Sequence, residues 1–285
     1  MGVMEMEGSR HGIEDGTSRH GQPEVADVEK PSAARIYDYL LGGSYNFEAD
    51  RRVGEQTKEV YPGIVATMWA NRAFLRRAVE YLVGAGVRQF LDVGSGIPTV
   101  GHVHEVAQAA APDARVVYVD IDPVAVNLSR EILSDNDRTA VIQEDVRAPE
   151  RILDHPDLRS LIDLEQPVAL LVVALFHFVP DRDDPKGLIA RLSAPLVSGS
   201  YLVLSHATED GIRDDTETAK AKEIYRSSGI DFTSRTRAQV TAMFAGFDLV
   251  EPGLVRVSQW RPDADTAVDD SPASSANYAG VGRKP

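Results

Sequence analysis

The stretch Phe90-Leu-Asp-Val-Gly-Ser-Gly-Ile-Pro-Thr99 decides the fold expected for this chain. An apolar strand ends here, and Gly94, Ser95 and Gly96 follow it. The two glycines permit a tight turn into a helix and a close approach of the backbone to a bulky ligand. Asp92 lies two residues before the first glycine. A carboxylate at this place disfavours a pyrophosphate, which needs N–H groups and little negative charge. It suits a ligand that carries positive charge.

Strand and helix patterns alternate from Arg88 onward. Short apolar strands that alternate with helices are typical of a parallel sheet covered on both faces. The predicted strands span 88–94, 115–120, 139–143, 167–175 and 199–205, and the predicted helices span 99–110, 123–134, 148–154 and 185–195. Two further strands, 246–251 and 254–260, are joined by Pro252-Gly253. That connection is too short for a crossover, so we expect an antiparallel hairpin. The predicted fold class is α/β, a Rossmann-like doubly wound sheet of seven mostly parallel strands with this C-terminal hairpin.

Helix patterns also precede the first strand. One runs over 31–41 and is ended by Gly42-Gly43, a second follows Asn46, and a third covers 62–83. Both ends of the chain are poor in large apolar residues, which is typical of mobile tails. We therefore expect a disordered tail over 1–30, an N-terminal helical cap over 31–86, a ligand-binding Rossmann-like domain over 87–262, and a second disordered tail over 263–285.

Composition excludes several classes of function. The formal net charge of −14 over 285 residues repels phosphate backbones and anionic lipids, so we expect neither a nucleic acid nor a membrane as partner. Without cysteine, the chain has no disulfide, thiolate zinc site or iron–sulfur cluster. His102 and His104 are two residues apart on a predicted helix and point to different sides, so we expect no metal site. The sequence contains no apolar run of membrane-spanning length and no apolar signal core, and we expect a cytoplasmic protein.

Acidic residues follow three successive strands, whose carboxyl ends hold the ligands of doubly wound sheets. Asp120 ends the second strand, where a carboxylate can accept hydrogen bonds from two ribose hydroxyls. Asp122 precedes Pro123 and is predicted to cap the next helix. After the third strand, Asp145 can accept a hydrogen bond from an adenine amino group, and the Val146 N–H can return one. Three acids around one site suit a nucleoside without phosphates.

These residues resemble the motifs of class I methyltransferases that use S-adenosyl-L-methionine (SAM). The resemblance narrows to an actinobacterial family of S-adenosyl methyltransferases whose substrate is undefined. It covers about residues 28–263 and rests on the blocks Arg35-Ile-Tyr-Asp-Tyr-Leu-Leu-Gly-Gly-Ser-Tyr-Asn-Phe-Glu-Ala-Asp-Arg51, His104-Glu-Val-Ala-Gln108, Val117-Tyr-Val-Asp-Ile-Asp-Pro123, Leu175-Phe-His-Phe-Val-Pro-Asp181 and Trp260-Arg-Pro-Asp263. It implies that SAM is the cofactor, with binding residues Asp92, Gly94, Ser95, Gly96, Asp120, Ile121, Asp145, Val146 and Leu175.

The predicted activity is methyl transfer to an unidentified, small-molecule acceptor. His177 follows the fourth strand and is the candidate base. Tyr45 lies in a glycine-hinged aromatic loop and is the candidate lid residue, whose ring can face the sulfonium. The oligomeric state stays open. One alternative is a catalytically silent SAM-binding regulator or partner protein. A nicotinamide dehydrogenase is disfavoured because Thr99 stands where its third glycine is expected.

Overall fold

The computed structural model describes residues 27–97, 101–210, 215–263 and 276–285. Residues 1–26 of the predicted tail 1–30 lie outside the described residues. The longer described helices are α1 (Ala33–Leu40), α2 (Glu48–Val60), α3 (Ile64–Gly84), α4 (Val103–Ala110), α5 (Pro123–Ile132), α8 (Pro185–Ser193) and α9 (Asp215–Ser227). The shorter ones are α6 (Pro149–Leu153), α7 (Pro156–Leu161) and α10 (Arg237–Ala242), with 3-10 turns η1 (Phe176–Phe178), η2 (Asp181–Asp183) and η3 (Val257–Gln259).

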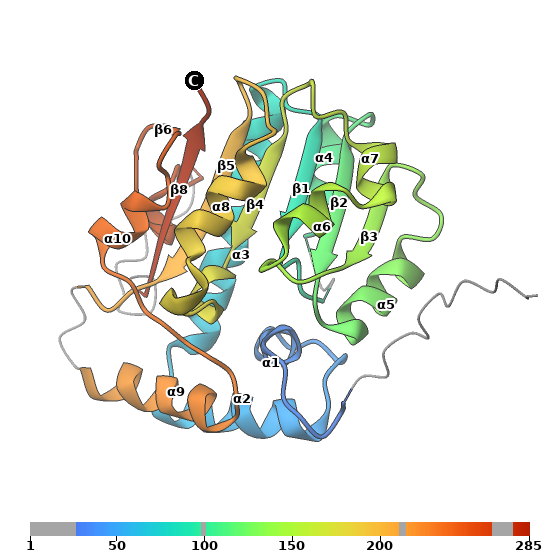
Figure 1. The fold of residues 1–285 in the computed structure, drawn as a ribbon. Helices are drawn as coiled ribbons and strands as arrows, with labels where there is room; N and C mark the ends of the chain where they lie inside the picture. Colours follow the sequence, from blue (N-terminus) through green and yellow to red (C-terminus); the bar gives the residue numbers. More distant parts are fainter. Residues whose placement is uncertain (1–26, 98–100, 211–214, 264–275) are drawn as a thin grey trace, which may run out of the picture.

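One mostly parallel sheet forms the centre of the molecule (Figure 1). Its strand order is β3-β2-β1-β4-β5-β8-β6, and β7 also pairs with β8. Strands β1 to β5 are parallel, whereas β8 runs antiparallel to β5. The strands are β1 (Gln89–Val93), β2 (Arg115–Asp120), β3 (Thr139–Gln143), β4 (Ala169–Val173), β5 (Tyr201–Ala207), β6 (Asp248–Leu249), β7 (Val255–Arg256) and β8 (Asn277–Arg283). The predicted Rossmann-like α/β class is confirmed.

The antiparallel part differs in detail from the prediction. Strands β6 and β7 each span two residues, and each pairs with β8 rather than with the other. Strand β8 makes the sheet eight-stranded and lies inside the predicted tail 263–285, so that prediction is wrong for 277–283. Gly280 and Gly282 interrupt the apolar pattern, so the sequence does not show this strand as an apolar run. They leave room for the Phe244 ring, because a Cβ on Gly282 would lie 3.0 Å from its Cδ1 and a Cβ on Gly280 would lie 3.1 Å from its Cζ. The rest of that tail, 264–275, lies outside the described residues.

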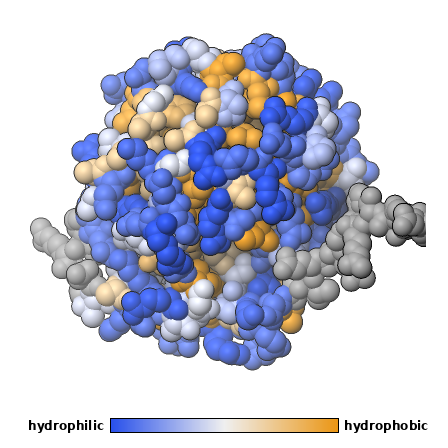
Figure 2. All heavy atoms as spheres, in the orientation of Figure 1, coloured by the Kyte–Doolittle hydropathy of each residue, from blue (hydrophilic) through white to orange (hydrophobic). Residues whose placement is uncertain are grey.

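Helices cover both faces of the sheet because its central strands are apolar on both sides. On one face, α3 and α4 pack with Phe90 and Trp260 in a single buried cluster. On the other, α6, α7, α8 and α10 contribute to a second cluster. Because α3 shares a buried cluster with the strands of the sheet, the predicted boundary at residue 86 does not separate two domains. The surface in Figure 2 is mostly hydrophilic, with hydrophobic residues in small groups.

The N-terminal helices α1 and α2 lie across the end of the sheet together with α9, which the sequence did not reveal (Figure 1). A buried arginine holds them there. Arg35 Nε on α1 lies 3.4 Å from a carboxylate oxygen of Asp50 on α2 and 3.4 Å from one of Asp122 after β2. Its guanidinium also donates to the Lys30 carbonyl at 2.6 Å. Arg35 and both acids are buried, so one cation neutralises two carboxylates from different elements.

Replacement of Arg35 by Ala is expected to lower the free energy of unfolding by about 3–5 kcal/mol, because two buried carboxylates lose their cation. Urea unfolding followed by circular dichroism measures this loss. Arg52→Ala is the matched control, because Arg52 is exposed and pairs with the exposed Glu48 one helical turn away. The control should change stability by less than about 0.5 kcal/mol. Equal losses in the two variants would show that the ion triad does not hold the N-terminal helices.

Candidate functional site

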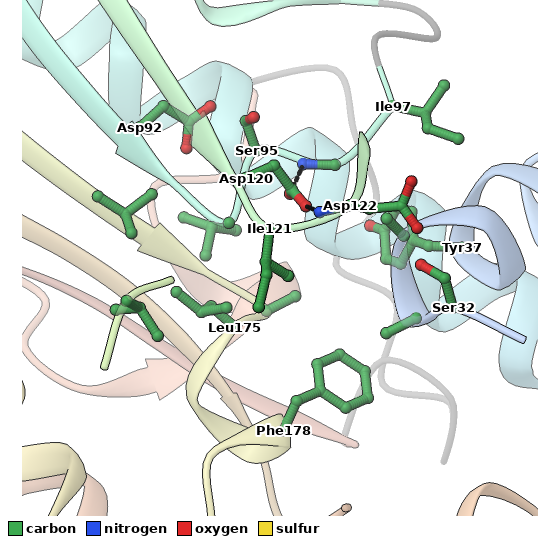
Figure 3. A pocket seen from close by; sticks show the side chains of 18 of the residues that line it. Ser32, Tyr37, Asp92, Ser95, Ile97, Asp120, Ile121, Asp122, Leu175 and Phe178 are labelled. Carbon is green, nitrogen blue, oxygen red and sulfur yellow. Dashed lines mark hydrogen bonds between the residues drawn. The ribbon is translucent and has the colours of Figure 1, made fainter. Parts of the chain in front are cut away.

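A cavity of about 210 Å³ lies at the carboxyl ends of β1 to β4, where the sequence places a ligand. All nine residues predicted to bind the cofactor line it: Asp92, Gly94, Ser95, Gly96, Asp120, Ile121, Asp145, Val146 and Leu175. Figure 3 labels Asp92, Ser95, Asp120, Ile121 and Leu175 among the side chains around this space. The structure brings these nine residues together, since the strand ends that carry them meet at one edge of the sheet.

The loop after β1 is shaped by its two glycines. Gly94 and Gly96 have φ of +74° and +67°, which side chains rarely adopt. The N–H groups of Gly94 and Ser95 both donate to the Val119 carbonyl, at 2.8 and 3.1 Å. A Cβ on Gly94 would lie 2.6 Å from Cδ1 of Leu175, which comes from the end of β4. Gly94 therefore allows the loop and Leu175 to approach each other at the floor of the cavity.

Asp120 connects this loop to the end of β2. Its Oδ2 accepts the Gly96 N–H at 2.7 Å, and its Oδ1 accepts the Asp122 N–H at 2.8 Å (Figure 3). Each carboxylate oxygen can accept two hydrogen bonds, so both keep capacity for a ligand hydroxyl. Burial raises the pKa of Asp120 to about 6. Asp122 accepts the N–H groups of Val124 and Ala125, as predicted for a cap of α5.

Asp92 is the second buried acid of the cavity. Burial raises its pKa to about 7, nearby Arg72 lowers it, and the neighbouring Asp120 carboxylate raises it further. Ionising two carboxyl groups together in one buried site is costly, because burial removes water from both charges and the two charges repel each other. A ligand with a positive charge next to Asp92 removes that cost. The sequence-based preference for a cationic ligand thus gains a physical basis.

The end of β3 supplies a less buried wall. Asp145 Oδ1 accepts two hydrogen bonds from Arg147, from its N–H at 2.8 Å and its Nε at 3.0 Å. The carboxylate retains capacity for further donors. Ile121 is 55% exposed although it is a large apolar residue, and it lines the same cavity. An exposed isoleucine at the mouth of a cavity suits a flat apolar ring, which would cover it.

The two predicted catalytic residues lie elsewhere. His177, in η1, is buried and lines a second cavity of about 80 Å³ rather than the first. Tyr45 is 47% exposed and lines neither of these two cavities. Only its backbone is fixed, through a hydrogen bond to Asp38. In this conformation the structure does not bring Tyr45 together with the other predicted residues.

Among the lining residues that the sequence-based prediction did not include are Tyr37 on α1 and Asn71 and Arg72 on α3. The Asn71 amide donates to the Tyr37 hydroxyl at 3.3 Å, and its carbonyl oxygen accepts the Ser205 hydroxyl at 2.5 Å. A signal existed for Asn71, because it lies three and four residues before Phe74 and Leu75 on the buried face of α3. A polar residue on such a face is a candidate for a site.

Two features are absent from the described part of the chain. Within it, no three His, Cys, Asp or Glu side chains are grouped so that they could hold a metal ion. His104 instead contacts the Tyr118 hydroxyl at 2.8 Å. Among the described helices, none combines the length and apolar character needed to cross a membrane.

Comparison with known proteins identifies the family. Residues 19–285 match the family model described as S-adenosyl methyltransferase. The chain belongs to the S-adenosyl methyltransferase family. A DUF574 family protein from Streptomyces avermitilis is 44% identical, with a TM-score of 0.87 over 91% of this chain and 99% of that one. A crystallised putative methyltransferase from Thermobifida fusca is 41% identical, with a TM-score of 0.85 over 90% and 96% of the two chains. No match was found among curated proteins.

The cofactor of this family is SAM, and the residues present fit it. The cavity offers glycine backbone for close approach, a buried carboxylate with spare acceptor capacity at Asp120, and a second carboxylate at Asp92 that favours positive charge. The dehydrogenase alternative is not favoured, since the family match covers nearly the whole chain.

Gly94→Ala is expected to weaken the binding of S-adenosylhomocysteine at least tenfold, because the new methyl group collides with Leu175 in the floor of the cavity. Isothermal titration calorimetry measures the dissociation constant. Gly86→Ala is the control, because Gly86 also has a positive φ but faces open space away from the site. This control should keep the affinity within about twofold. It separates the effect of the new methyl group in the cavity from the effect of backbone strain. An unchanged affinity in Gly94→Ala would contradict the close approach described for this loop.

Proposed function

We propose that this protein transfers the methyl group of SAM to a small-molecule acceptor. The observation that carries the proposal is the pair of buried carboxyl groups, Asp92 and Asp120, whose pKa values are raised in a glycine-floored cavity. Such a pair is unfavourable in a protein that binds nothing there, and it suits a ligand with both hydroxyl and cationic groups.

Each cofactor-binding residue then has a distinct role. Asp120 accepts hydrogen bonds from the two ribose hydroxyls while it continues to hold the Gly96 loop. Asp92 faces the amino group of the methionine part. Ile121 packs against the adenine ring. Asp145 accepts a hydrogen bond from the adenine amino group, and the Val146 N–H donates one to the ring. Gly94, Ser95, Gly96 and Leu175 form the surface on which the cofactor rests.

When bound, SAM supplies a methyl carbon that its sulfonium activates toward nucleophiles. The protein therefore mainly has to orient the acceptor and exclude water. We assign part of this positioning to the backbone turn at Ala174, which lines the cavity and whose φ of +56° is held by hydrogen bonds from its N–H to the hydroxyl and the carbonyl oxygen of Ser205. A non-glycine residue in this conformation stores strain, which is common at functional sites.

His177 is the residue we propose to accept a proton from the acceptor. Burial, with help from the nearby His206 and Arg235, holds the pKa of His177 well below its usual range. The imidazole is then neutral at physiological pH, which is the form that accepts a proton, and the same burial makes it a weaker base than a solvated histidine. His206 is unsuited to this task, because its ring contacts the Ala207 carbonyl at 2.7 Å and Arg235 at 2.8 Å.

A catalytically silent SAM-binding protein is the alternative, and the family match does not favour it. A cytoplasmic location and the absence of nucleic-acid partners stay predictions from the sequence.

Activity is tested by incubating the protein with methyl-labelled SAM and a small-molecule extract of actinobacterial cells. Labelled products separable by liquid chromatography are expected with the wild-type protein. Asp120→Ala should reduce their formation at least a hundredfold at low cofactor concentration, because the ribose loses its acceptor. Binding of S-adenosylhomocysteine without labelled product in any extract would favour the silent alternative.

The affinity for S-adenosylhomocysteine is expected to depend on pH through Asp92. Because the pKa of this carboxyl is raised to about 7, the group is protonated in the free protein at lower pH. A cationic amino group binds the ionised form, so the dissociation constant should rise by up to about tenfold per unit as the pH falls below 7. Calorimetry between pH 5.5 and about 8.5 measures this slope.

Asp92→Asn is the matched control for this titration, since it keeps the shape and removes the ionisation. The variant should bind more weakly at pH 8 and lose the slope between pH 6 and 7. A shallower dependence below about pH 6 should remain, because the pKa of Asp120 is raised to about 6. An unaltered slope in Asp92→Asn would assign the titration to another group.

A further inference from the structure

A second cavity opens directly beside the cofactor cavity. It lies among α1, α2, α3, α9 and the segment after β4, and its volume is about 80 Å³. Five residues line both cavities: Ala33, Tyr37, Asn71, Ala174 and Phe178. A molecule in the second cavity therefore contacts the same residues as the cofactor, and Ala174 marks the place where the two spaces meet.

Aromatic side chains dominate one side of the second cavity. Phe178, Tyr225 and Phe232 lie around it, with ring centroids 5.6 to 6.1 Å apart. The His177 ring lies 5.0 Å from Phe232 in the same cluster. Aromatic side chains favour offset and edge-to-face contacts with other rings. This wall favours a flat, apolar ligand.

The cavity carries almost no charge. Of the described residues that line it, Lys222 is the only one with a formally charged side chain at neutral pH. Lys222 is already paired with Glu209, and burial lowers its pKa. The cofactor cavity, by contrast, contains Asp92 and Asp120. An anionic or cationic ligand would have to leave water without a counter-charge in the second cavity, so a neutral ligand is favoured.

Two buried polar atoms on this cavity have no hydrogen-bond partner, namely His177 Nδ1 and Ser234 Oγ. A buried polar atom left unpaired costs on the order of 1–3 kcal/mol. Both belong to side chains that line the otherwise largely apolar space. A hydroxyl group on the ligand is of the kind that can pair with such an atom, since it both donates and accepts a hydrogen bond.

We propose that the second cavity is the site of the methyl acceptor and that the acceptor is a small, uncharged aromatic molecule with a hydroxyl group. The identification as acceptor site rests on the proposed methyl transfer. In that reaction a bond forms between the hydroxyl oxygen and the methyl carbon, while the bond from that carbon to sulfur breaks. The electron pair of the broken bond stays on sulfur, and the hydroxyl proton passes to His177.

Binding of simple probes tests the proposal without requiring turnover. Phenol, toluene and benzoate are titrated into the protein saturated with S-adenosylhomocysteine, and ligand-detected NMR measures their affinities. Phenol is expected to bind several-fold more tightly than toluene, and benzoate is expected not to bind. Tighter binding of benzoate than of phenol would overturn the assignment of a neutral ligand.

Substitutions on α9 locate the probe. Ala221 lines the second cavity but not the cofactor cavity, so Ala221→Phe should fill the space, abolish phenol binding and leave the affinity for S-adenosylhomocysteine within about twofold. Ala219→Phe is the matched control, because Ala219 is exposed on the same helix. It should change neither affinity. Unaltered phenol binding in Ala221→Phe would place the probe elsewhere and overturn the proposal.

Ser234→Ala tests the polar contact. It should remove part of the preference for phenol over toluene while toluene affinity stays constant, whereas an unchanged preference would contradict the role of the unpaired atoms. The failures are distinguishable. Loss of S-adenosylhomocysteine binding in the wild-type protein would count against the proposed function itself. Intact binding of that ligand with no site for phenol would count only against the acceptor site.

Discussion

The rest of the site depends on the hydrogen bonds that the Asp120 carboxylate accepts. By accepting the N–H groups of Gly96 and Asp122, it fixes the loop after β1 against the turn after β2. Asp122 in turn caps α5 and contacts Arg35, which also contacts Asp50 on α2. One chain of charged groups thus runs from the glycine loop to the N-terminal helices. The cofactor cavity and the helices that close it are therefore parts of one electrostatic arrangement.

This arrangement has an energetic cost that a ligand can offset. The pKa values of Asp92 and Asp120 are raised to about 7 and about 6, so the folded chain holds these protons more tightly than the unfolded chain. Their contribution to stability is complete below about pH 4 and is lost as the pH rises through 6 to 7. At physiological pH the ligand-free site is destabilised by its own acids. A cationic cofactor reverses the penalty at Asp92, so binding and folding are coupled at this position.

The sequence predicted the parts of the site that depend on local patterns. Gly94, Asp120 and Asp145 follow apolar strands, and parallel strands bring their carboxyl ends to one edge, so the three could be placed together. The second cavity could not be predicted in this way, because α9 packs beside α2 from far along the chain and no motif marks that contact. The role of Tyr45 stays a prediction, since its half-exposed side chain lines neither of the two cavities. Strand β8 was missed because its glycines serve the packing of Phe244 and Phe247.

Strand β8 also has a consequence for how the chain reaches its folded state. It pairs along the whole of β5, although α9, α10, β6 and β7 come between the two in the sequence. Until β8 arrives, β5 is a sheet edge with unpaired N–H and C=O groups and a buried, apolar sequence. Such an edge is a template for pairing with another chain. Because closure of a long loop delays that protection, self-association during refolding is the hazard that this topology creates. The pairing of β8 with β5 removes this hazard.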